Sequence, residues 1–283
     1  MSQSAETPIV STGWLEDHLS DPNVRVLEIC ALTSDEVYRS GHVPGAQWVY
    51  WKGACWHETD REFVKPEQLA QHFGSLGIGP DTTVVLYGDP VQYGTYAYWA
   101  FKMAGHKNLK VLDGGRTKWV AEGRALSQDV PKPTPVAYPA PAPDPSSRVG
   151  REDVRAKLKL PGRILLDVRS TEEYTGKRVI EYSAPFDHGA ERFGRIPGAV
   201  NMYYKAFLNA DDSYKSPDEM RAALAAAGIS TDTSDEVVCY CRLSHRATLV
   251  WTAMTEILGM KNVKIYDGSW TEWGSIVGFP IEK

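Results

Sequence analysis

A cysteine in the second half of the chain follows a strand-like run and precedes a helix-like run. Cys241 comes directly after Glu236–Tyr240, a helix is predicted from about Ala247, and Arg242 and Arg246 follow the thiol. The N–H groups at a helix N-terminus and nearby guanidinium groups stabilise a thiolate, and the same groups hold anions. The pattern predicts a thiolate nucleophile beside an anion-binding loop. The alternative is an inert cysteine at the end of a strand.

The loop that begins at this cysteine supplies the other candidate site residues. We predict that Cys241 is catalytic and that the five residues after it bind the substrate: Arg242, Leu243, Ser244, His245 and Arg246. For either arginine, the alternatives are exposure to solvent or a salt bridge to Asp167. The Ser244 hydroxyl could reach a group bound at Cys241 or close a turn, and His245 could bind an anion or simply face solvent.

Cys239 stands two residues before the predicted nucleophile, in the middle of the apolar run. We expect its side chain to pack inside the sheet. The alternative is a reversible disulfide bridge between Cys239 and Cys241, which the geometry of residues i and i+2 in a strand would strain.

Composition limits the kinds of partner and compartment. The chain has 283 residues, 42% of them hydrophobic, and a net charge of −5, so we expect two domains and no nucleic-acid partner. The residues from Met1 to Pro8 do not resemble a secretory signal, and no apolar run has the length that spans a bilayer. The four cysteines form no Cys-x-x-Cys pair. We therefore expect a cytoplasmic protein with no membrane attachment, no metal site and no cofactor.

The chain also repeats itself once. Residues that recur in the same order in both halves are Gly41, Pro44, Gly45 and Ala46 with Gly194, Pro197, Gly198 and Ala199; Gly77-Ile78 with Gly228-Ile229; and Asp113-Gly114 and Trp119 with Asp267-Gly268 and Trp273. The period is longer than that of any solenoid, so the pattern predicts a duplicated domain. We expect the two tryptophans to pack in the cores.

A proline-rich segment separates the two copies. Seven prolines lie between Val130 and Ser147, which excludes a regular helix or central strand and favours an extended connector. We predict an N-terminal domain at residues 1–128, a linker at 129–147 and a C-terminal domain at 148–283. The alternative is a proline-rich ligand for a partner domain, but no clear basic anchor accompanies it.

Short apolar runs alternate with helical patterns in each copy. Strands are predicted at Val24–Ile29, Thr83–Tyr87, Leu109–Leu112, Ile164–Val168, Glu236–Tyr240 and Val263–Tyr266. Helices are predicted at Pro66–Leu76, at Pro217–Ala227 and on an apolar face from Val250 to Leu258, closed by Gly259. Such alternation is typical of an α/β fold whose mostly parallel sheet has helices on both faces. Ligands in these folds bind beyond the carboxyl ends of the strands, where Cys241 lies.

Two motifs resemble those of the tandem-domain rhodaneses, the thiosulfate and 3-mercaptopyruvate sulfurtransferases. They are Tyr38-x-x-x-His42-Val43-Pro44-Gly45-Ala46 and Tyr266-Asp267-Gly268-Ser269-Trp270-Thr271-Glu272-Trp273. With the duplication and the Cys241 loop, the resemblance covers nearly the whole chain. It implies that Cys241 becomes a persulfide and that the first domain is not catalytic. Consistent with this, Tyr87-Gly88-Asp89-Pro90 stands where Tyr240-Cys241-Arg242 stands in the second domain.

The length of the loop separates this chain from other enzymes with the same fold. Dual-specificity phosphatases and arsenate reductases have Cys-x5-Arg, whereas here the arginine comes one residue earlier, at Arg246. The loop content favours a dianionic donor, because mercaptopyruvate enzymes typically have the neutral sequence Cys-Gly-Ser-Gly-Val-Thr. The loop also departs from the best-known animal thiosulfate enzymes, which have lysine and glycine within it.

The resemblance implies a thiosulfate sulfurtransferase with a small-molecule donor and a thiophilic acceptor, with cyanide as the acceptor in assays and the cellular acceptor, which could be a protein, left open. Mercaptopyruvate sulfurtransfer is one alternative. Another is a persulfide carrier or regulatory binding module that exchanges sulfur with a protein partner. An insertion in the second copy could roof the pocket or only face solvent; it contains Lys177, Arg178, Arg192 and Arg195.

Overall fold

The computed structural model describes residues 7–178 and 190–283. The chain divides into two compact units. Unit 1 comprises Met1–Pro145 and Ala210–Tyr214, and unit 2 comprises Ser146–Asn209 and Lys215–Lys283. The sequence therefore returns to unit 1 for five residues after unit 2 has begun. No helix among the described residues is both long and apolar enough to cross a membrane.

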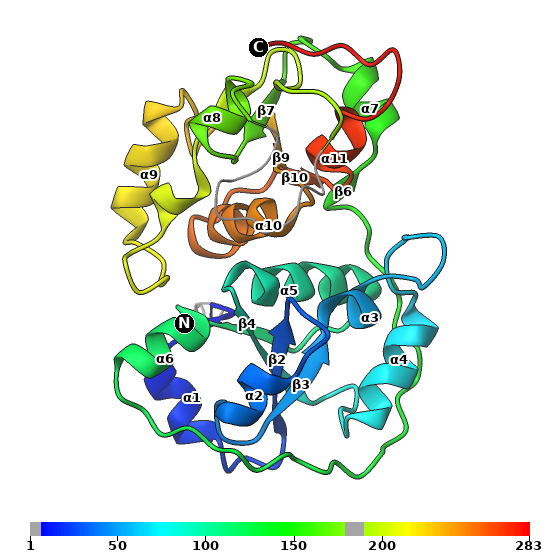
Figure 1. The fold of residues 1–283 in the computed structure, drawn as a ribbon, viewed down its shortest axis with the longest axis vertical. Coiled ribbons are helices and arrows are strands. Elements are labelled where there is room, and N and C mark those ends of the chain that lie inside the picture. The colour runs from blue at the N-terminus through cyan, green and yellow to red at the C-terminus, as the bar shows by residue number, and fades with distance from the viewer. Residues whose placement is uncertain (1–6, 179–189) are drawn as a thin grey trace, which may run out of the picture. The chain divides into compact units, whose positions relative to one another are not determined.

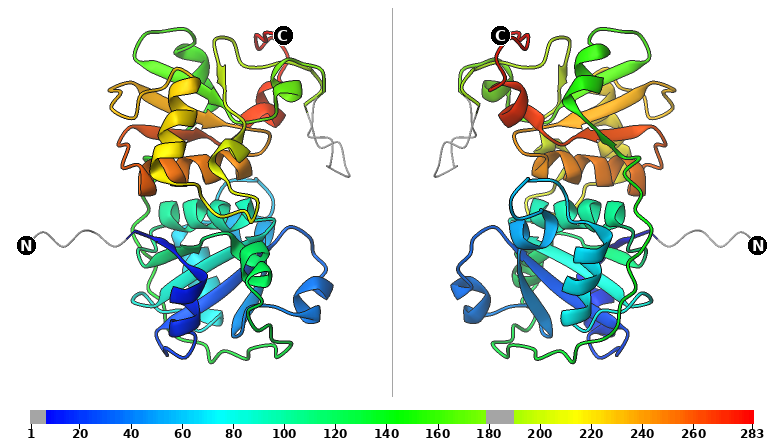
Figure 2. Two further views of the ribbon diagram at one scale, coloured as in Figure 1. Left: turned by 90° about the vertical axis from the view of Figure 1, so that its left-hand side faces the viewer. Right: turned by 90° about the vertical axis from the view of Figure 1, so that its right-hand side faces the viewer.

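Unit 1 is a five-stranded parallel sheet with helices on both faces (Figures 1 and 2). Its strand order is β1-β5-β4-β2-β3. Its strands are β1 (Ile9–Val10), β2 (Val24–Cys30), β3 (Ala46–Tyr50), β4 (Thr83–Asp89) and β5 (Leu109–Leu112). Its helices are α1 (Thr12–His18), α2 (Glu36–Ser40), α3 (Trp51–Cys55), α4 (Pro66–Ser75), α5 (Gln92–Ala104) and α6 (Gly115–Ala121).

Unit 2 repeats this topology, with the strand order β6-β10-β9-β7-β8 and every pairing parallel. Its strands are β6 (Arg148–Val149), β7 (Arg163–Asp167), β8 (Val200–Asn201), β9 (Glu236–Tyr240) and β10 (Val263–Tyr266). Its α-helices are α7 (Arg151–Ala156), α8 (Thr171–Tyr174), α9 (Pro217–Ala226), α10 (His245–Thr252) and α11 (Ser269–Trp273). A 3₁₀ turn, η1 (Tyr204–Phe207), and a π-helical turn, η2 (Ala253–Ile257), complete it.

The two units show the duplication at the level of single turns. Gly45 and Gly198 have φ angles of 76° and 79°, which glycine adopts without strain. Just after each, the carbonyl group of Ala46 or Ala199 accepts a hydrogen bond from a tyrosine hydroxyl, that of Tyr38 (2.8 Å) or Tyr174 (2.7 Å). The recurring glycines and alanines therefore mark the same turn in both units.

The structure confirms the α/β fold and all six strands expected from apolar runs. Trp119 and Trp273 are buried in the cores, as predicted. The short strands β1, β6 and β8 escaped the sequence analysis because two residues make no pattern. β3 was missed because Gln47 interrupts its apolar run.

The helix expected to run through Leu258 changes its geometry after Thr252. The Leu258 N–H bonds to the Ala253 carbonyl at 2.9 Å, which is the spacing of a π-helix. The Thr255 hydroxyl bonds to the Trp251 carbonyl at 2.9 Å, a contact that loosens the helical ladder. As a result, Ile257 and Leu258 are only half-buried, and the predicted apolar face ends at Met254.

The proline-rich segment forms no helix or strand between residues 130 and 145, as its prolines predict. It packs on unit 1 rather than lying free. The Val136 N–H bonds to the Gly74 carbonyl at 3.0 Å, the Tyr138 hydroxyl lies 2.7 Å from His106 Nδ1, and the Asp144 N–H bonds to the Met103 carbonyl at 2.7 Å.

Residues 210–214 complete unit 1 at its α6 end. Lys118 contacts Asp211 at 2.7 Å, the Thr117 hydroxyl donates to Asp212 at 3.0 Å, and the Tyr214 N–H donates to Asp113 at 2.8 Å. The Lys118 ammonium and the Ser213 hydroxyl lower the pKa of Asp211 to about 2.

Candidate active site

Cys241 lies at the carboxyl edge of the unit 2 sheet. It directly follows β9, which lies between β7 and β10 in the sheet, and every residue of β9 after Glu236 is buried. The Cys241 side chain is itself buried, with 1% of the residue exposed. The loop ends at Ser244, whose φ of 70° turns the chain into α10. The structure therefore places the thiol between a strand and a helix, as the sequence indicated.

The first turn of α11 holds the carbonyl groups of this loop. The N–H of Trp270 donates to the Cys241 carbonyl at 2.9 Å, and the N–H of Thr271 donates to the Arg242 carbonyl at 3.1 Å. The Cys241 N–H donates to the Ser269 hydroxyl at 3.2 Å. These three bonds fix the start of the loop to the turn between β10 and α11.

The next three backbone N–H groups remain available. Within the described residues, no hydrogen bond uses the N–H of Arg242, Leu243 or Ser244. Consecutive N–H groups in a tight turn form a nest that binds anions. The loop can therefore stabilise negative charge at the Cys241 sulfur.

The Ser244 hydroxyl is hydrogen-bonded within the protein. It donates to the Asp267 carbonyl at 2.5 Å and lies 3.3 Å from the Ser269 hydroxyl. The residue is fully buried. Of the two roles expected for this hydroxyl, the structure favours the closing of a turn, and substrate binding by Ser244 stays a prediction for its N–H group.

Arg246 makes a two-point ion pair with Glu173 on α8. Its Nη1 and Nη2 atoms lie 2.8 and 2.9 Å from the two carboxylate oxygens. Burial alone would raise the pKa of Glu173, but the hydrogen bonds and charge of Arg246 hold it below the ordinary value of 4.5. Arg246 thus ties α10 to α8, and direct contact with a donor stays a prediction.

The alternative of a salt bridge to Asp167 is wrong for both loop arginines. Asp167 is fully buried and pairs with Arg169, whose Nη2 lies 2.6 Å from a carboxylate oxygen. The Arg169 guanidinium also lies 4.7 Å from the ring centre of Trp270. Burial opposes the charge of Arg169, but the Asp167 carboxylate raises its pKa above the usual arginine value.

The sequence analysis missed Glu173, although a signal for its position was present. Ser170-x-x-Glu173 is a capping-box pattern, and the structure shows the Ser170 N–H bonded to Glu173 at 3.1 Å. The pattern predicts the start of a helix. The pairing with Arg246, 73 residues away in the sequence, is a tertiary contact.

The remaining loop residues differ in exposure. Arg242 and Leu243 are half-buried, and His245 is 8% exposed at the start of α10. The Arg242 Nη1 atom is shielded from solvent and has no hydrogen-bond partner in the described part of the chain. The alternative that His245 simply faces solvent is therefore wrong. Arg242, in contrast, has a guanidinium N–H group that is available to a ligand.

Cys239 is fully buried in β9, and burial raises the pKa of its thiol. This agrees with a packing role. No disulfide joins it to Cys241.

The cationic residues of the insertion are more engaged than expected. Arg192 donates to the carbonyl groups of Trp273, Gly274, Ile276 and Phe279 at 2.7–3.0 Å. The alternative to a roof over the pocket was a side chain exposed to solvent. That alternative is wrong for Arg192, because its guanidinium group caps the end of α11. The Arg195 guanidinium lies 4.5 Å from the Tyr174 ring centre, and the middle of the insertion, 179–189, lies outside the described residues.

The corresponding position of unit 1 has no room for a side chain. Tyr87 pairs with Glu28 across the sheet as Tyr240 pairs with Asp167, so Gly88 corresponds to Cys241. A Cβ atom on Gly88 would lie 2.5 Å from the Gly94 nitrogen and 2.7 Å from the Pro90 carbonyl oxygen. The loop of unit 1 therefore has no space for a cysteine side chain at this position.

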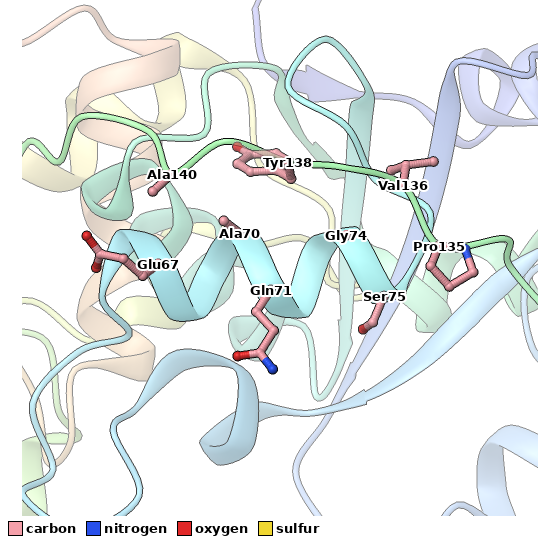
Figure 3. A pocket seen from close by; sticks show the side chains of 9 residues that line it. All are labelled: Glu67, Ala70, Gln71, Gly74, Ser75, Pro135, Val136, Tyr138 and Ala140. Carbon is pink, nitrogen blue, oxygen red and sulfur yellow. The ribbon is translucent and has the colours of Figure 1, made fainter.

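A pocket in unit 1 offers no comparable chemistry. It has a volume of about 520 Å³ and lies between α4 and the proline-rich segment, as Figure 3 shows. Its lining contains no cysteine or histidine: Glu67, Ala70, Gln71, Gly74, Ser75, Pro135, Val136, Tyr138 and Ala140. Across residues 7–178 and 190–283, no group of three or more His, Cys, Asp or Glu side chains has a geometry that could hold a metal ion.

In a comparison with known proteins, both halves of the chain match the same family. Residues 11–122 and 151–276 each match the family described as "Rhodanese-like domain". The "Sulfur carrier protein TtuD" of Thermus thermophilus is 44% identical, over 97% of this chain and 96% of that protein. A Saccharopolyspora erythraea protein named "Putative thiosulfate sulfurtransferase" is 40% identical, over 99% of this chain and 97% of the relative.

Solved structures with the same fold include an anaerobic ergothioneine biosynthesis enzyme from Chlorobium limicola, determined with its natural substrate trimethyl histidine. It is 26% identical, with a TM-score of 0.82 over 98% of this chain and 70% of that chain. A structure of EanB as a cysteine persulfide with ergothioneine is 25% identical, with a TM-score of 0.83 and the same coverage.

Proposed function

Since the chain belongs to the rhodanese family of sulfurtransferases, with one rhodanese-like domain in each half, we propose that it is a thiosulfate sulfurtransferase acting through a persulfide on Cys241. The observation that carries this proposal is the loop from Cys241 to Ser244. It combines a thiol with three consecutive unused N–H groups, at the carboxyl edge of the sheet. We assign no catalytic role to unit 1 and no cofactor to either unit.

In the first half-reaction, the Cys241 thiolate attacks the outer sulfur of thiosulfate. The S–S bond of thiosulfate breaks, and sulfite leaves with the bonding electron pair. The product is a Cys241 persulfide, whose terminal sulfur carries the negative charge that the thiolate had. The N–H groups of Arg242, Leu243 and Ser244 are suited to stabilise that charge, because they are positioned before the reaction begins.

In the second half-reaction, a thiophilic acceptor attacks the terminal sulfur and restores the thiolate. With cyanide as the acceptor, the product is thiocyanate. Neither step moves a proton or an electron to a third group, so the chemistry needs no metal or organic cofactor.

The two arginines of the loop have different roles in this proposal. Arg242, which follows the nucleophile in the chain and has an unpaired guanidinium nitrogen, binds the anionic donor. Arg246 and Glu173 hold α10 against α8 and so position the loop. His245 and Leu243 form the rest of the substrate-binding loop.

Intact-protein mass spectrometry tests the proposal. The wild-type chain and Cys241→Ser are each mixed with thiosulfate, and cyanide is then added. We expect a gain of one sulfur on the wild type alone, lost again as thiocyanate forms. Sulfur on Cys241→Ser, or none on the wild type with any donor, is incompatible with the proposal. A gain with mercaptopyruvate but not thiosulfate would change the donor and leave the persulfide in place.

The similarity to a sulfur carrier protein favours a second candidate, in which a protein supplies or receives the sulfur. Turnover then depends on the partner. A Cys241 that loads rapidly from a cysteine desulfurase but slowly from every small donor would support the carrier over the thiosulfate enzyme.

A further inference from the structure

Two polar atoms beside the catalytic loop are buried but unpaired. They are Nη1 of Arg242 and Oγ1 of Thr271, and neither has a hydrogen-bond partner in the part of the chain that the structure describes. They come from different elements, the loop after β9 and the first turn of α11. The bond from the Thr271 N–H to the Arg242 carbonyl, at 3.1 Å, makes the two residues neighbours.

Three polar side chains near them are engaged. The Ser244 hydroxyl bonds to Asp267, the Ser269 hydroxyl bonds to the Tyr266 carbonyl at 2.9 Å, and Arg246 is paired with Glu173. A buried donor without a partner destabilises a fold, and folded proteins contain few of them. Two such atoms, on two residues that contact each other at the Cys241 loop, therefore indicate groups held ready for a ligand.

The chemistry of the two groups indicates the kind of ligand. A guanidinium nitrogen and a hydroxyl group both donate, and together they suit an oxyanion that presents more than one oxygen. Arg242 directly follows Cys241 in the chain, and a guanidinium group in this loop is suited to hold the oxyanion of a donor that reacts at the thiol. Thiosulfate and organic thiosulfonates carry oxygens on the sulfur atom bonded to the one transferred, whereas mercaptopyruvate has two carbons between its thiol and its carboxylate.

We propose that the Thr271 hydroxyl, together with Arg242, binds the sulfonyl-type oxygens of the donor, which makes Thr271 a specificity-determining residue. This inference rests on the proposed function and names the donor class for the same site. As the thiolate attacks and the S–S bond breaks, the electron pair moves onto the departing sulfite or sulfinate. The two donors stabilise the charge on its oxygens while the sulfur remains on Cys241.

The test compares two donors on matched variants. Thr271→Val keeps the shape and removes the hydroxyl, and Thr271→Ser restores a hydroxyl. Ser275→Ala is the control, since its exposed hydroxyl lies on the same segment and bonds only to the Thr271 carbonyl. The rate of persulfide formation is followed by mass spectrometry with thiosulfate and with inorganic polysulfide, which has no oxyanion group.

We expect Thr271→Val to load from thiosulfate about tenfold more slowly, as the loss of one hydrogen bond to a charged group predicts. Loading from polysulfide should not change, and Thr271→Ser and Ser275→Ala should match the wild type with both donors. Equal rates for Thr271→Val and the wild type with thiosulfate, or equal losses with both donors, overturn the inference. A wild type that accepts sulfur from polysulfide but not thiosulfate overturns the inference and thiosulfate as the donor, and leaves the persulfide on Cys241 in place. One that accepts sulfur from no donor overturns the whole proposed function.

Discussion

Arg246 and Glu173 face each other through two hydrogen bonds of 2.8 and 2.9 Å, and neither side chain is more than 8% exposed. A buried pair of this kind is sensitive to the loss of one partner, because the remaining charge stays in the interior. Its position between α8 and the start of α10 makes it a support for the catalytic loop.

Removal of the Glu173 charge should destabilise unit 2. In Glu173→Gln the Arg246 guanidinium stays buried without a counter-ion, and we expect a loss of about 3 kcal/mol in the free energy of unfolding. Urea denaturation measures it. Asp218→Asn is the control, because it breaks an exposed pair with Arg221 and should leave the midpoint unchanged. Similar midpoints for the two variants would contradict a supporting role for the buried pair.

Glu28 in unit 1 should make stability fall as the pH rises. Burial raises its pKa above 4.5, and the hydrogen bond from Tyr87 and the charge of Arg116 only partly oppose this. The folded state therefore holds the proton more tightly than the unfolded state. The resulting stability is present below pH 4.5 and is lost as the pH rises through the folded-state pKa.

Glu28→Gln removes this dependence. We expect the variant to be more stable than the wild type at pH 7, with a smaller difference at pH 4. Urea denaturation at both pH values checks the sign, and the same difference at both would show that ionisation of Glu28 does not contribute.

Arg192 should matter for stability and not for donor affinity. Its guanidinium group bonds to four carbonyl groups at the end of α11, so Arg192→Gln should reduce the free energy of unfolding by about 2 kcal/mol. Below the melting temperature of the variant, its KM for thiosulfate should equal that of the wild type. An increased KM in the folded variant would instead place Arg192 at the substrate.

Gly88 cannot be converted into a second nucleophile. A Cβ atom there would meet the backbone of Gly94 and Pro90, so Gly88→Ala should be destabilised by about 2 kcal/mol and Gly88→Cys should gain no second sulfur. Gly53→Ala is the control, because an added Cβ meets nothing within 4 Å at that exposed position in α3. Thermal melting and intact mass are the measurements, and two sulfurs on Gly88→Cys would be the contrary result.

Cys239 should take no part in sulfur transfer. Its thiol is buried, and burial disfavours its thiolate. Cys239→Ala should therefore load one sulfur at the wild-type rate. A slower rate, or a disulfide in the oxidised wild type that the variant lacks, would indicate a redox role.

The sequence predicts some elements of this molecule better than others, for physical reasons. Three strands have the predicted bounds, Glu236–Tyr240, Leu109–Leu112 and Val263–Tyr266, because short runs dominated by apolar residues are typical of strands. The position of Cys241 follows from the same reasoning.

The ion pairs that hold the elements around the catalytic loop together could not be predicted from apolar runs. The pairs Arg246–Glu173 and Arg169–Asp167 depend on which of many opposite charges meet after folding. Thr271 carried no signal beyond its place in a motif. A buried atom without a partner is visible only in three dimensions.

The halves of the sequence are not the units of the structure, because Ala210–Tyr214 belong to unit 1. During synthesis, Asp113 and Lys118 leave the ribosome long before Tyr214 and Asp211, the residues that they bind. Unit 1 is therefore not complete until most of unit 2 has been translated. A chain cut after residue 145 keeps the proline-rich segment but lacks these five residues, so the first domain made alone is an incomplete unit rather than an independent module.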